Sequence, residues 1–338
     1  MAKRNNTPLG IFTEAIGLYF SNFDKFIKYM TFPVLGQIGG LLLVFLITYF
    51  YTQNLPPLIE KFSALDNFNV LILLSILITL PGLAIFCKSF WEYLVAYGAV
   101  NSMYENMQKS GRVYDFDAHT ELIKRRAIPF IGLWFLFGIF SAIALCPLFW
   151  VICGILAVYF VLTFQVFTFE PELSPVGCVK KSLTLVKGHF SSTFMLMALS
   201  GALTYILIPQ IVIKIFDLSG ISEFLSKGIL PFVNLMPLPE LEQFGLKSPT
   251  AYDVAIFTIQ TFVAQILIQY TLPLRSILWS LWYKNLNSGI SKISSSKRPS
   301  ERLMEKSHKK YGKKKDLSGY GGCAGTRNVH DRTDRMWK

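Results

Sequence analysis

Glu170 and Glu172 form the acidic pair whose position in the sequence is most suggestive of chemistry. They follow a long apolar segment and precede a stretch that carries lysines. A pair of carboxylates can serve as general acid and base, but catalysis also needs partner groups that this sequence does not supply. We therefore expect Glu170 or Glu172 to cap a helix or to pair with Lys180 or Lys181.

Sequence motifs of the common enzyme classes are absent. The 338-residue chain has no HExxH, GxSxG, P-loop or GxGxxG pattern. Its five cysteines include no CxxC pair, and its four histidines lack the spacing of metal ligands. We predict that the protein is not an enzyme, with no catalytic residue, no cofactor and no metal site.

A polar stripe on the last apolar segment is the second candidate site. Thr258, Thr261, Gln265 and Gln269 recur at spacings of three and four, so a helix would place them on one face. Such residues at membrane depth form hydrogen bonds between helices or line a water-filled path. We favour hydrogen bonds between helices and keep a path for a small molecule as the alternative.

The composition is that of a membrane protein. Hydrophobic residues make up 52% of the chain and charged residues 16%, whereas roughly a quarter of the residues are charged in soluble domains. A helix needs about 20 apolar residues to cross a bilayer. We predict an all-α polytopic membrane helix bundle with six transmembrane helices, at about residues 32–51, 69–88, 128–146, 148–169, 194–216 and 252–274.

The distribution of Lys and Arg predicts the orientation. Outer loops would hold only Lys61, Lys227 and Lys247, with Lys214 near the end of the fifth span, while every inner segment contributes basic residues. By the positive-inside rule, both termini then face the cytoplasm. Lys88 and Arg275 fall at the inner ends of spans, where we interpret them as interface anchors, and Glu92 lies one turn from Lys88 as its possible partner.

Amphipathic segments alternate with the spans on the cytoplasmic side, at residues 11–30, 117–126 and 175–190. In the third, Val176, Val179, Leu183 and Val186 recur with helical period, after an expected cap at Ser174 and before Gly188, which is placed to end the helix. These helices either lie in the membrane interface or pack on the bundle as connectors, and both alternatives stay open. The predicted anionic-lipid contacts are Lys124, Arg125, Arg126, Lys180, Lys181 and Lys187.

Three regions follow from this pattern. Residues 1–31 form an amphipathic interfacial helix, residues 32–290 the six-span membrane domain, and residues 291–338 a basic, disordered cytoplasmic tail. The composition of the tail favours a solvated segment over one that binds nucleic acid.

Two features inside the spans predict local geometry. Gly36 and Gly40 form a GxxxG pattern, which lets helices approach closely, either within the bundle or in a homo-oligomer. We favour packing within the bundle. Pro273 should kink the sixth span just before its inner end.

Short motifs resemble a superfamily of six-span bacterial integral membrane proteins. They are the FQVFTFEPELSP stretch of residues 164–175, the KSLTLVKGHF stretch of residues 181–190, Phe20 to Phe23, and Pro273 followed by LWYKNL at residues 281–286. The superfamily includes the membrane domain of some glycerophosphodiester phosphodiesterases and related uncharacterised membrane families. Asn285 replaces an acidic residue of the closing motif, and a matching Arg is missing. The resemblance implies the architecture and an inner-membrane location, and no activity, because the phosphodiesterase domain is missing.

These observations predict a membrane scaffold or accessory protein that organises lipids or partner proteins. Its predicted partners are the lipid bilayer and anionic lipids of the cytoplasmic face, with a protein partner or a homo-oligomer left open. A transporter or channel for a small or amphiphilic molecule is the alternative, and an enzyme acting on lipid headgroups ranks third.

Overall fold

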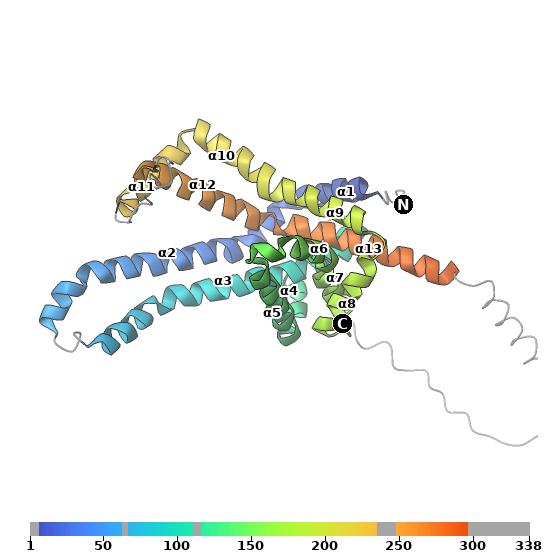
Figure 1. The fold of residues 1–338 in the computed structure, drawn as a ribbon, viewed down its shortest axis with the longest axis horizontal. Coiled ribbons are helices and arrows are strands. Elements are labelled where there is room, and N and C mark those ends of the chain that lie inside the picture. Colours follow the sequence, from blue (N-terminus) through green and yellow to red (C-terminus); the bar gives the residue numbers. More distant parts are fainter. Residues whose placement is uncertain (1–6, 63–66, 111–115, 235–247, 297–338) are drawn as a thin grey trace, which may run out of the picture. The chain divides into compact units, whose positions relative to one another are not determined.

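The computed structural model describes residues 7–62, 67–110, 116–234 and 248–296, and within them every regular element is a helix (Figure 1). The chain divides into two units, Met1–Asn287 and Ser288–Lys338, and the buried hydrophobic clusters lie in the first. A 3₁₀ turn occupies Pro147–Phe149 and a π-helical turn Ala202–Leu207. The α-helices are α1 (Pro8–Phe20), α2 (Phe23–Lys61), α3 (Phe68–Ser110), α4 (Phe116–Lys124), α5 (Ala127–Ala144), α6 (Trp150–Phe160), α7 (Thr163–Phe169), α8 (Pro175–Val186), α9 (Phe190–Gly201), α10 (Ile208–Leu218), α11 (Ile221–Val233), α12 (Ala251–Tyr270) and α13 (Leu272–Ser296).

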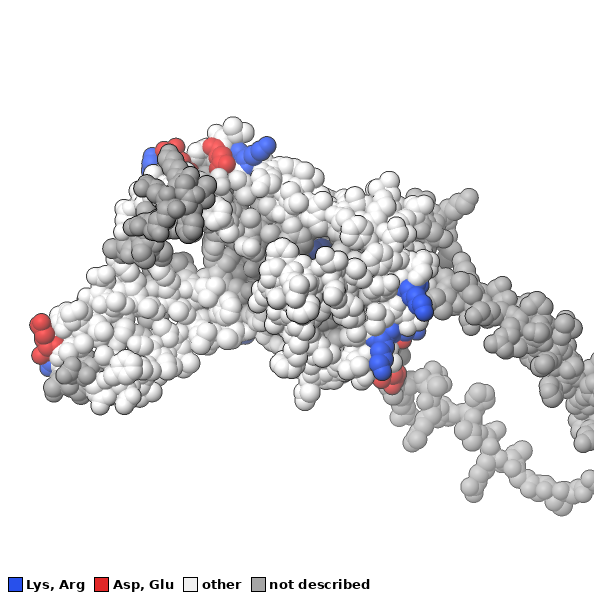
Figure 2. Space-filling view, in the orientation of Figure 1, with Lys and Arg blue, Asp and Glu red and all other residues white. Residues whose placement is uncertain are grey.

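Six segments are long and apolar enough to cross a membrane, which confirms the predicted six-span, all-α membrane bundle. They are Phe23–Pro57, Phe68–Met103, Ala127–Ala144, Pro147–Phe169, Phe190–Leu218 and Ala251–Ser288. In the most apolar part of the second segment only 6% of the residues are buried inside the protein, so most of its side chains face outward and suit contact with lipid tails. Figure 2 shows long uncharged stretches over α2, α3 and α10, with charged residues gathered near their ends.

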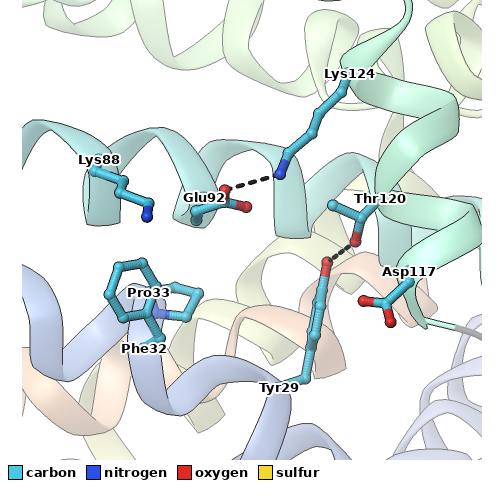
Figure 3. Close-up of a pocket in the computed structure, with 8 residues that line it drawn as sticks. All are labelled: Tyr29, Phe32, Pro33, Lys88, Glu92, Asp117, Thr120 and Lys124. Carbon is cyan, nitrogen blue, oxygen red and sulfur yellow. Dashed lines mark hydrogen bonds and ion pairs between the residues drawn. The ribbon is translucent and has the colours of Figure 1, made fainter.

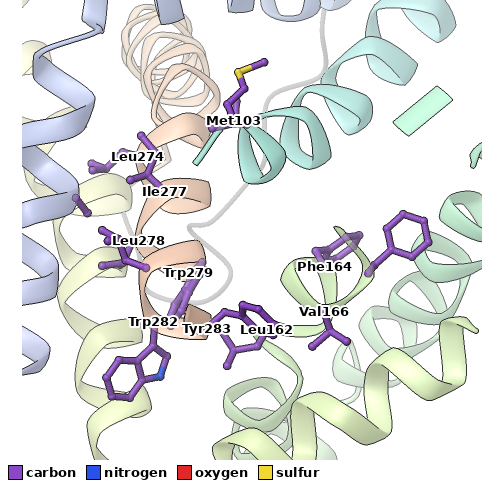
Figure 4. Packing of buried hydrophobic residues seen from close by; sticks show 14 of the residues in the cluster. Met103, Leu162, Phe164, Val166, Leu274, Ile277, Leu278, Trp279, Trp282 and Tyr283 are labelled. Atoms are coloured by element: carbon purple, nitrogen blue, oxygen red, sulfur yellow. The ribbon is translucent and has the colours of Figure 1, made fainter. Parts of the chain in front are cut away.

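The main core surrounds the first half of α13. Leu274, Ile277, Leu278 and Trp282 of this helix belong to a buried cluster that also contains residues of α3 and α7 (Figure 4). Trp282 Nε1 also donates a hydrogen bond of 3.0 Å to the Thr193 hydroxyl on α9. The core therefore connects α13 with α3, α7 and α9.

The N-terminal helix differs from the prediction. The expected helix over residues 11–30 is broken at Ser21 and Asn22, so residues 23–30 belong to the long helix α2. The side chain of Asn22 donates to the Leu18 carbonyl and that of Ser21 to the Gly17 carbonyl, which satisfies carbonyls at the end of α1. The apolar period continues across this break, and for that reason the sequence pattern did not reveal it.

Helices α1, α4 and α8 each bury apolar residues in the protein. Ile11 and Ala15 of α1, Ile123 of α4 and Leu185 of α8 all belong to the main core. Of the two alternatives for these helices, the contacts favour connectors that pack on the bundle.

Helix α8 begins and ends as predicted. The Ser174 hydroxyl accepts a hydrogen bond from the Gly177 backbone N–H, and Gly188, with φ of 87°, follows the helix end. Cys178, Ser182, Leu185 and Val186 are the buried residues of α8, whereas Val176 is 53% exposed. Of the apolar residues that recur with helical period, Val186 is therefore buried, Val179 and Leu183 are partly buried, and Val176 is exposed.

A break divides the sixth span close to Pro273, as predicted. Helix α12 ends at Tyr270 and α13 begins at Leu272. Arg275 Nη2 donates to the Ile268 carbonyl at 3.0 Å, and the guanidinium also contacts the Tyr205 hydroxyl. The Arg275 side chain thus supplies a donor to a carbonyl in the last turn of α12.

Candidate functional site

A cavity of about 370 Å³ lies where α2, α3 and α4 meet (Figure 3). Each helix contributes residues spaced three or four apart or adjacent to one another, so each presents one face to the cavity. The lining residues are Tyr29, Phe32 and Pro33 from α2, Lys88 and Glu92 from α3, and Asp117, Thr120 and Lys124 from α4.

Two polar contacts connect α4 with α2 and α3. Lys124 Nζ lies 2.8 Å from Glu92 Oε1, an ion pair between α4 and α3. The Tyr29 and Thr120 hydroxyl oxygens lie 2.6 Å apart and share a hydrogen bond between α2 and α4. The walls of the cavity are thus held together by their own polar groups.

The expected pairing of Lys88 with Glu92 is replaced by this ion pair. Lys124 reaches Glu92 from α4, while the Lys88 ammonium lies 5.6 Å from the centre of the Phe32 ring. The packing of the short helix α4 on α3 brings Lys124 next to Glu92. The spacing of residues along α3 alone does not reveal this contact. Lys88 remains exposed.

Lys88 and Asp117 therefore remain as the unneutralised charges of the cavity lining. Both side chains are exposed, and neither forms an ion pair within the described part of the chain. In Figure 3, Lys88 lies beside Phe32, whereas Asp117 lies beyond Tyr29 and Thr120. The cavity can thus offer a cation and an anion at different places to one ligand.

The six predicted lipid contacts differ in their surroundings. Arg126 and Lys181 are held by the protein: Arg126 Nη1 donates to the Phe167 carbonyl at 2.6 Å, and Lys181 Nζ lies 3.7 Å from Glu170 Oε1. Burial lowers the pKa of the Arg126 guanidinium. Arg126 Cζ lies 4.0 Å from the centre of the Phe167 ring. Lys124 is in the cavity, and Arg125 pairs with Glu121 at 3.4 Å. Lys180 and Lys187 are exposed.

Glu170 has the structural partners expected of it. Besides Lys181, it accepts a hydrogen bond of 2.7 Å from the Tyr283 hydroxyl on α13. The carboxylate therefore links α8 and α13 to the end of α7. Glu172 is exposed.

The polar stripe of α12 is mostly exposed. Thr258, Thr261 and Gln265 are exposed, and the Thr258 hydroxyl donates to the Val254 carbonyl of its own helix at 2.7 Å. Gln269 alone of the stripe meets another helix, because its Oε1 lies 3.5 Å from Gln37 Nε2 on α2. None of the four residues lines the α2–α3–α4 cavity.

A buried polar cluster that the sequence analysis missed lies at the meeting of α3, α7 and α13. Asn101 Oδ1 accepts hydrogen bonds from Gln165 Nε2, at 3.2 Å, and from the hydroxyls of Ser276 and Ser280. Asn101 Nδ2 and Gln165 Oε1 are buried without a partner in the structure. A single amide within an apolar run, such as Gln165, was the available sequence signal.

A second cavity, of about 240 Å³, is wholly apolar. Its lining residues are Leu136, Phe137, Phe140, Phe160, Val176 and Val179. It offers no polar group for orienting a ligand. In the described residues there is also no group of His, Cys, Asp and Glu that could hold a metal ion.

No family model, curated protein or solved structure matches this chain. The interpretation of the site accordingly depends on its own geometry. The strongest arrangement for ligand chemistry is the α2–α3–α4 cavity, with its two unneutralised charges.

Proposed function

We propose that this protein is a multi-pass scaffold of a bacterial cytoplasmic membrane that organises phospholipids at the inner face of the bilayer. Both termini lie in the cytoplasm, and the architecture is that of the six-span superfamily that the sequence motifs resemble. The chain performs no reaction of its own. Lipid headgroups are its ligands, and anionic lipids gather at the exposed basic residues of the same face.

The α2–α3–α4 cavity is the observation that carries this proposal. It lies at the end of the charge-free stretch of α3, which runs from Phe68 to Cys87 and is followed by Lys88. Twenty helical residues span about 30 Å, the thickness of the hydrocarbon core. The cavity thus occurs at the level where headgroups meet water, and Lys180 and Lys187 add exposed cations on α8 and directly after it.

The transport alternative has less support. A path through the sixth span needs the polar stripe to line an internal space, but three of its four residues are exposed on the outside of the bundle. The fourth, Gln269, contacts Gln37 and ties α12 to α2. We therefore assign Gln269 to a contact between helices and assign no transport path to the stripe.

Native mass spectrometry of the full-length protein in detergent tests the proposal. We expect phospholipid to be retained by the wild type, and Lys88→Gln together with Lys180→Gln to reduce the retained amount several-fold. Lys227→Gln is the matched control, because Lys227 is an exposed lysine of α11 that pairs with Glu223 and lies outside the cavity. A retained small polar solute in place of phospholipid, or equal retention by all variants, would contradict the proposal.

A further inference from the structure

Among the lining residues that the structure describes, the charges of the α2–α3–α4 cavity sum to zero. Lys124 and Glu92 neutralise each other across 2.8 Å, and the remaining Lys88 and Asp117 carry one charge of each sign. A headgroup with only a negative charge would be attracted by the Lys88 ammonium but repelled by the Asp117 carboxylate. A net-neutral headgroup that carries both signs satisfies both residues.

The chemistry of the two residues defines which neutral headgroup fits. Lys88 presents an ammonium, which binds a phosphodiester oxygen by a charge-assisted hydrogen bond. Asp117 presents a carboxylate, which only accepts hydrogen bonds and so needs an N–H donor from the ligand. A primary ammonium supplies three N–H donors, whereas a quaternary choline group supplies none.

The other lining residues suit the same ligand. Phe32 and Pro33 give an apolar wall beneath the Lys88 side chain (Figure 3). The Tyr29 and Thr120 hydroxyls, already bonded to each other, can each form one more hydrogen bond. The position of Lys88 after the apolar stretch of α3 places all of these groups at headgroup depth.

We propose that this cavity selects an aminophospholipid of the phosphatidylethanolamine type, with the phosphate bound by Lys88 and the primary ammonium by Asp117. The inference rests on the proposed function, and it specifies a lipid class that the net positive charge of the chain does not predict. Anionic lipids would then interact with the exposed lysines outside the cavity.

The experiment compares three lipids with identical acyl chains added to the delipidated full-length protein. Phosphatidylethanolamine, phosphatidylcholine and phosphatidylglycerol differ only in headgroup, and native mass spectrometry counts the bound molecules of each. We expect phosphatidylethanolamine to bind more tightly than the other two. Asp117→Asn should weaken its binding by about tenfold, as for the loss of one charge-assisted hydrogen bond, and leave phosphatidylglycerol binding unchanged or stronger.

Matched variants separate the cavity from the general charge of the protein. Lys88→Gln should weaken all three lipids, because each carries the phosphate. Glu121→Gln changes an acid of the same helix α4 that pairs with Arg125 and does not line the cavity, so it should preserve the preference. Lys180→Gln should likewise leave the preference for phosphatidylethanolamine intact.

The possible failures can be told apart. A preference for phosphatidylglycerol that Asp117→Asn does not alter would overturn the assignment of the headgroup and leave the lipid-organising function standing. Binding of no phospholipid by the wild type would overturn both. Thermal unfolding of each variant without added lipid verifies that a lost preference reflects the cavity and not a loss of folding.

Discussion

Asn101 connects three helices inside the apolar bundle. Its side chain is fully buried, and one oxygen accepts hydrogen bonds from three residues on two other helices. An unpaired polar group away from water costs several kcal/mol, so these hydrogen bonds favour the arrangement in which the three helices meet. The amide therefore specifies how α3, α7 and α13 meet.

Replacing Asn101 by Ala should destabilise the protein by about 1–3 kcal/mol, because it removes the acceptor of Ser280 and one of two acceptors of Gln165 and Ser276. Unfolding by titration with sodium dodecyl sulfate, followed by circular dichroism, measures the change. Thr258→Ala is the control, since the exposed Thr258 hydroxyl bonds only its own helix, and we expect a change below about 0.5 kcal/mol. Equal stabilities of Asn101→Ala and wild type would show that the cluster is not structural.

Cys178 permits a pH-dependent prediction outside the spans. Burial raises the pKa of its thiol to about 11, and the nearby Arg126 guanidinium only partly opposes the effect. At pH 8 roughly one thiol in a thousand is then ionised in the folded protein, and the thiolate is the reactive form. Alkylation of Cys178 should therefore be slower in the folded protein than in the denatured protein at every pH from 8 to 10, because the folded thiol is both buried and protonated.

Peptide-resolved mass spectrometry after timed iodoacetamide treatment measures this rate. The denatured protein is the control, because an unperturbed thiol has a pKa of about 8.5 and its rate should level off above that pH. A folded-state rate equal to that of the denatured protein would contradict the burial of Cys178.

At the scale of elements, α2 and α3 cross in close backbone contact. A Cβ added at Gly40 would lie 2.6 Å from the Phe86 backbone nitrogen, and one at Gly82 would lie 2.9 Å from the Gly40 carbonyl oxygen. The predicted GxxxG face is thus used within the chain. Gly39, the neighbouring glycine, has no atom within 4 Å of such a Cβ.

Gly40→Ala and Gly39→Ala form a matched pair. Gly40→Ala should cost about 1–3 kcal/mol, since two backbones must separate to admit the methyl group. Gly39→Ala should be neutral or stabilising by up to about 1 kcal/mol, because alanine favours the helix. The same detergent titration compares them, and equal effects of the two substitutions would argue against the close crossing.

The spans were predictable because hydropathy is a local property of the chain. Each predicted span overlaps an observed one, and α8 was bounded in advance by Ser174 and Gly188, whose capping chemistry is also local. The break after Phe20 was not predicted, since it depends on side-chain hydrogen bonds of Ser21 and Asn22 inside a continuing apolar pattern. Local signals thus predicted where helices occur better than where a long helix divides.

The cavity belongs to the whole molecule and was beyond local patterns. Tyr29 and Thr120, which share a hydrogen bond, are 91 residues apart in the chain, and Glu92 and Lys124 are 32 apart. Lys124 was predicted as a lipid contact, but Lys88, Glu92 and Asp117 enter the site only through the packing of α4 on α3. The helix faces that meet cannot be read from the spacing within any one helix.

The orientation of the whole molecule gives the last prediction. Six spans place both ends of the membrane domain on one side, and the excess of Lys and Arg predicts that this side is the cytoplasm. Lys61, at the end of α2, and Lys187, after α8, are both exposed lysines, and they should then lie on opposite sides of the membrane.

Single substitutions Lys61→Cys and Lys187→Cys remove the same charge and can be compared directly. A membrane-impermeant maleimide should label Lys61→Cys in intact cells, and Lys187→Cys only after the membrane is opened. The wild type is the background control for the native cysteines. The reverse pattern would invert the orientation and place the α2–α3–α4 cavity in the outer leaflet. Labelling of both variants in intact cells would require an even number of spans between residues 61 and 187, in place of the three that the structure has there.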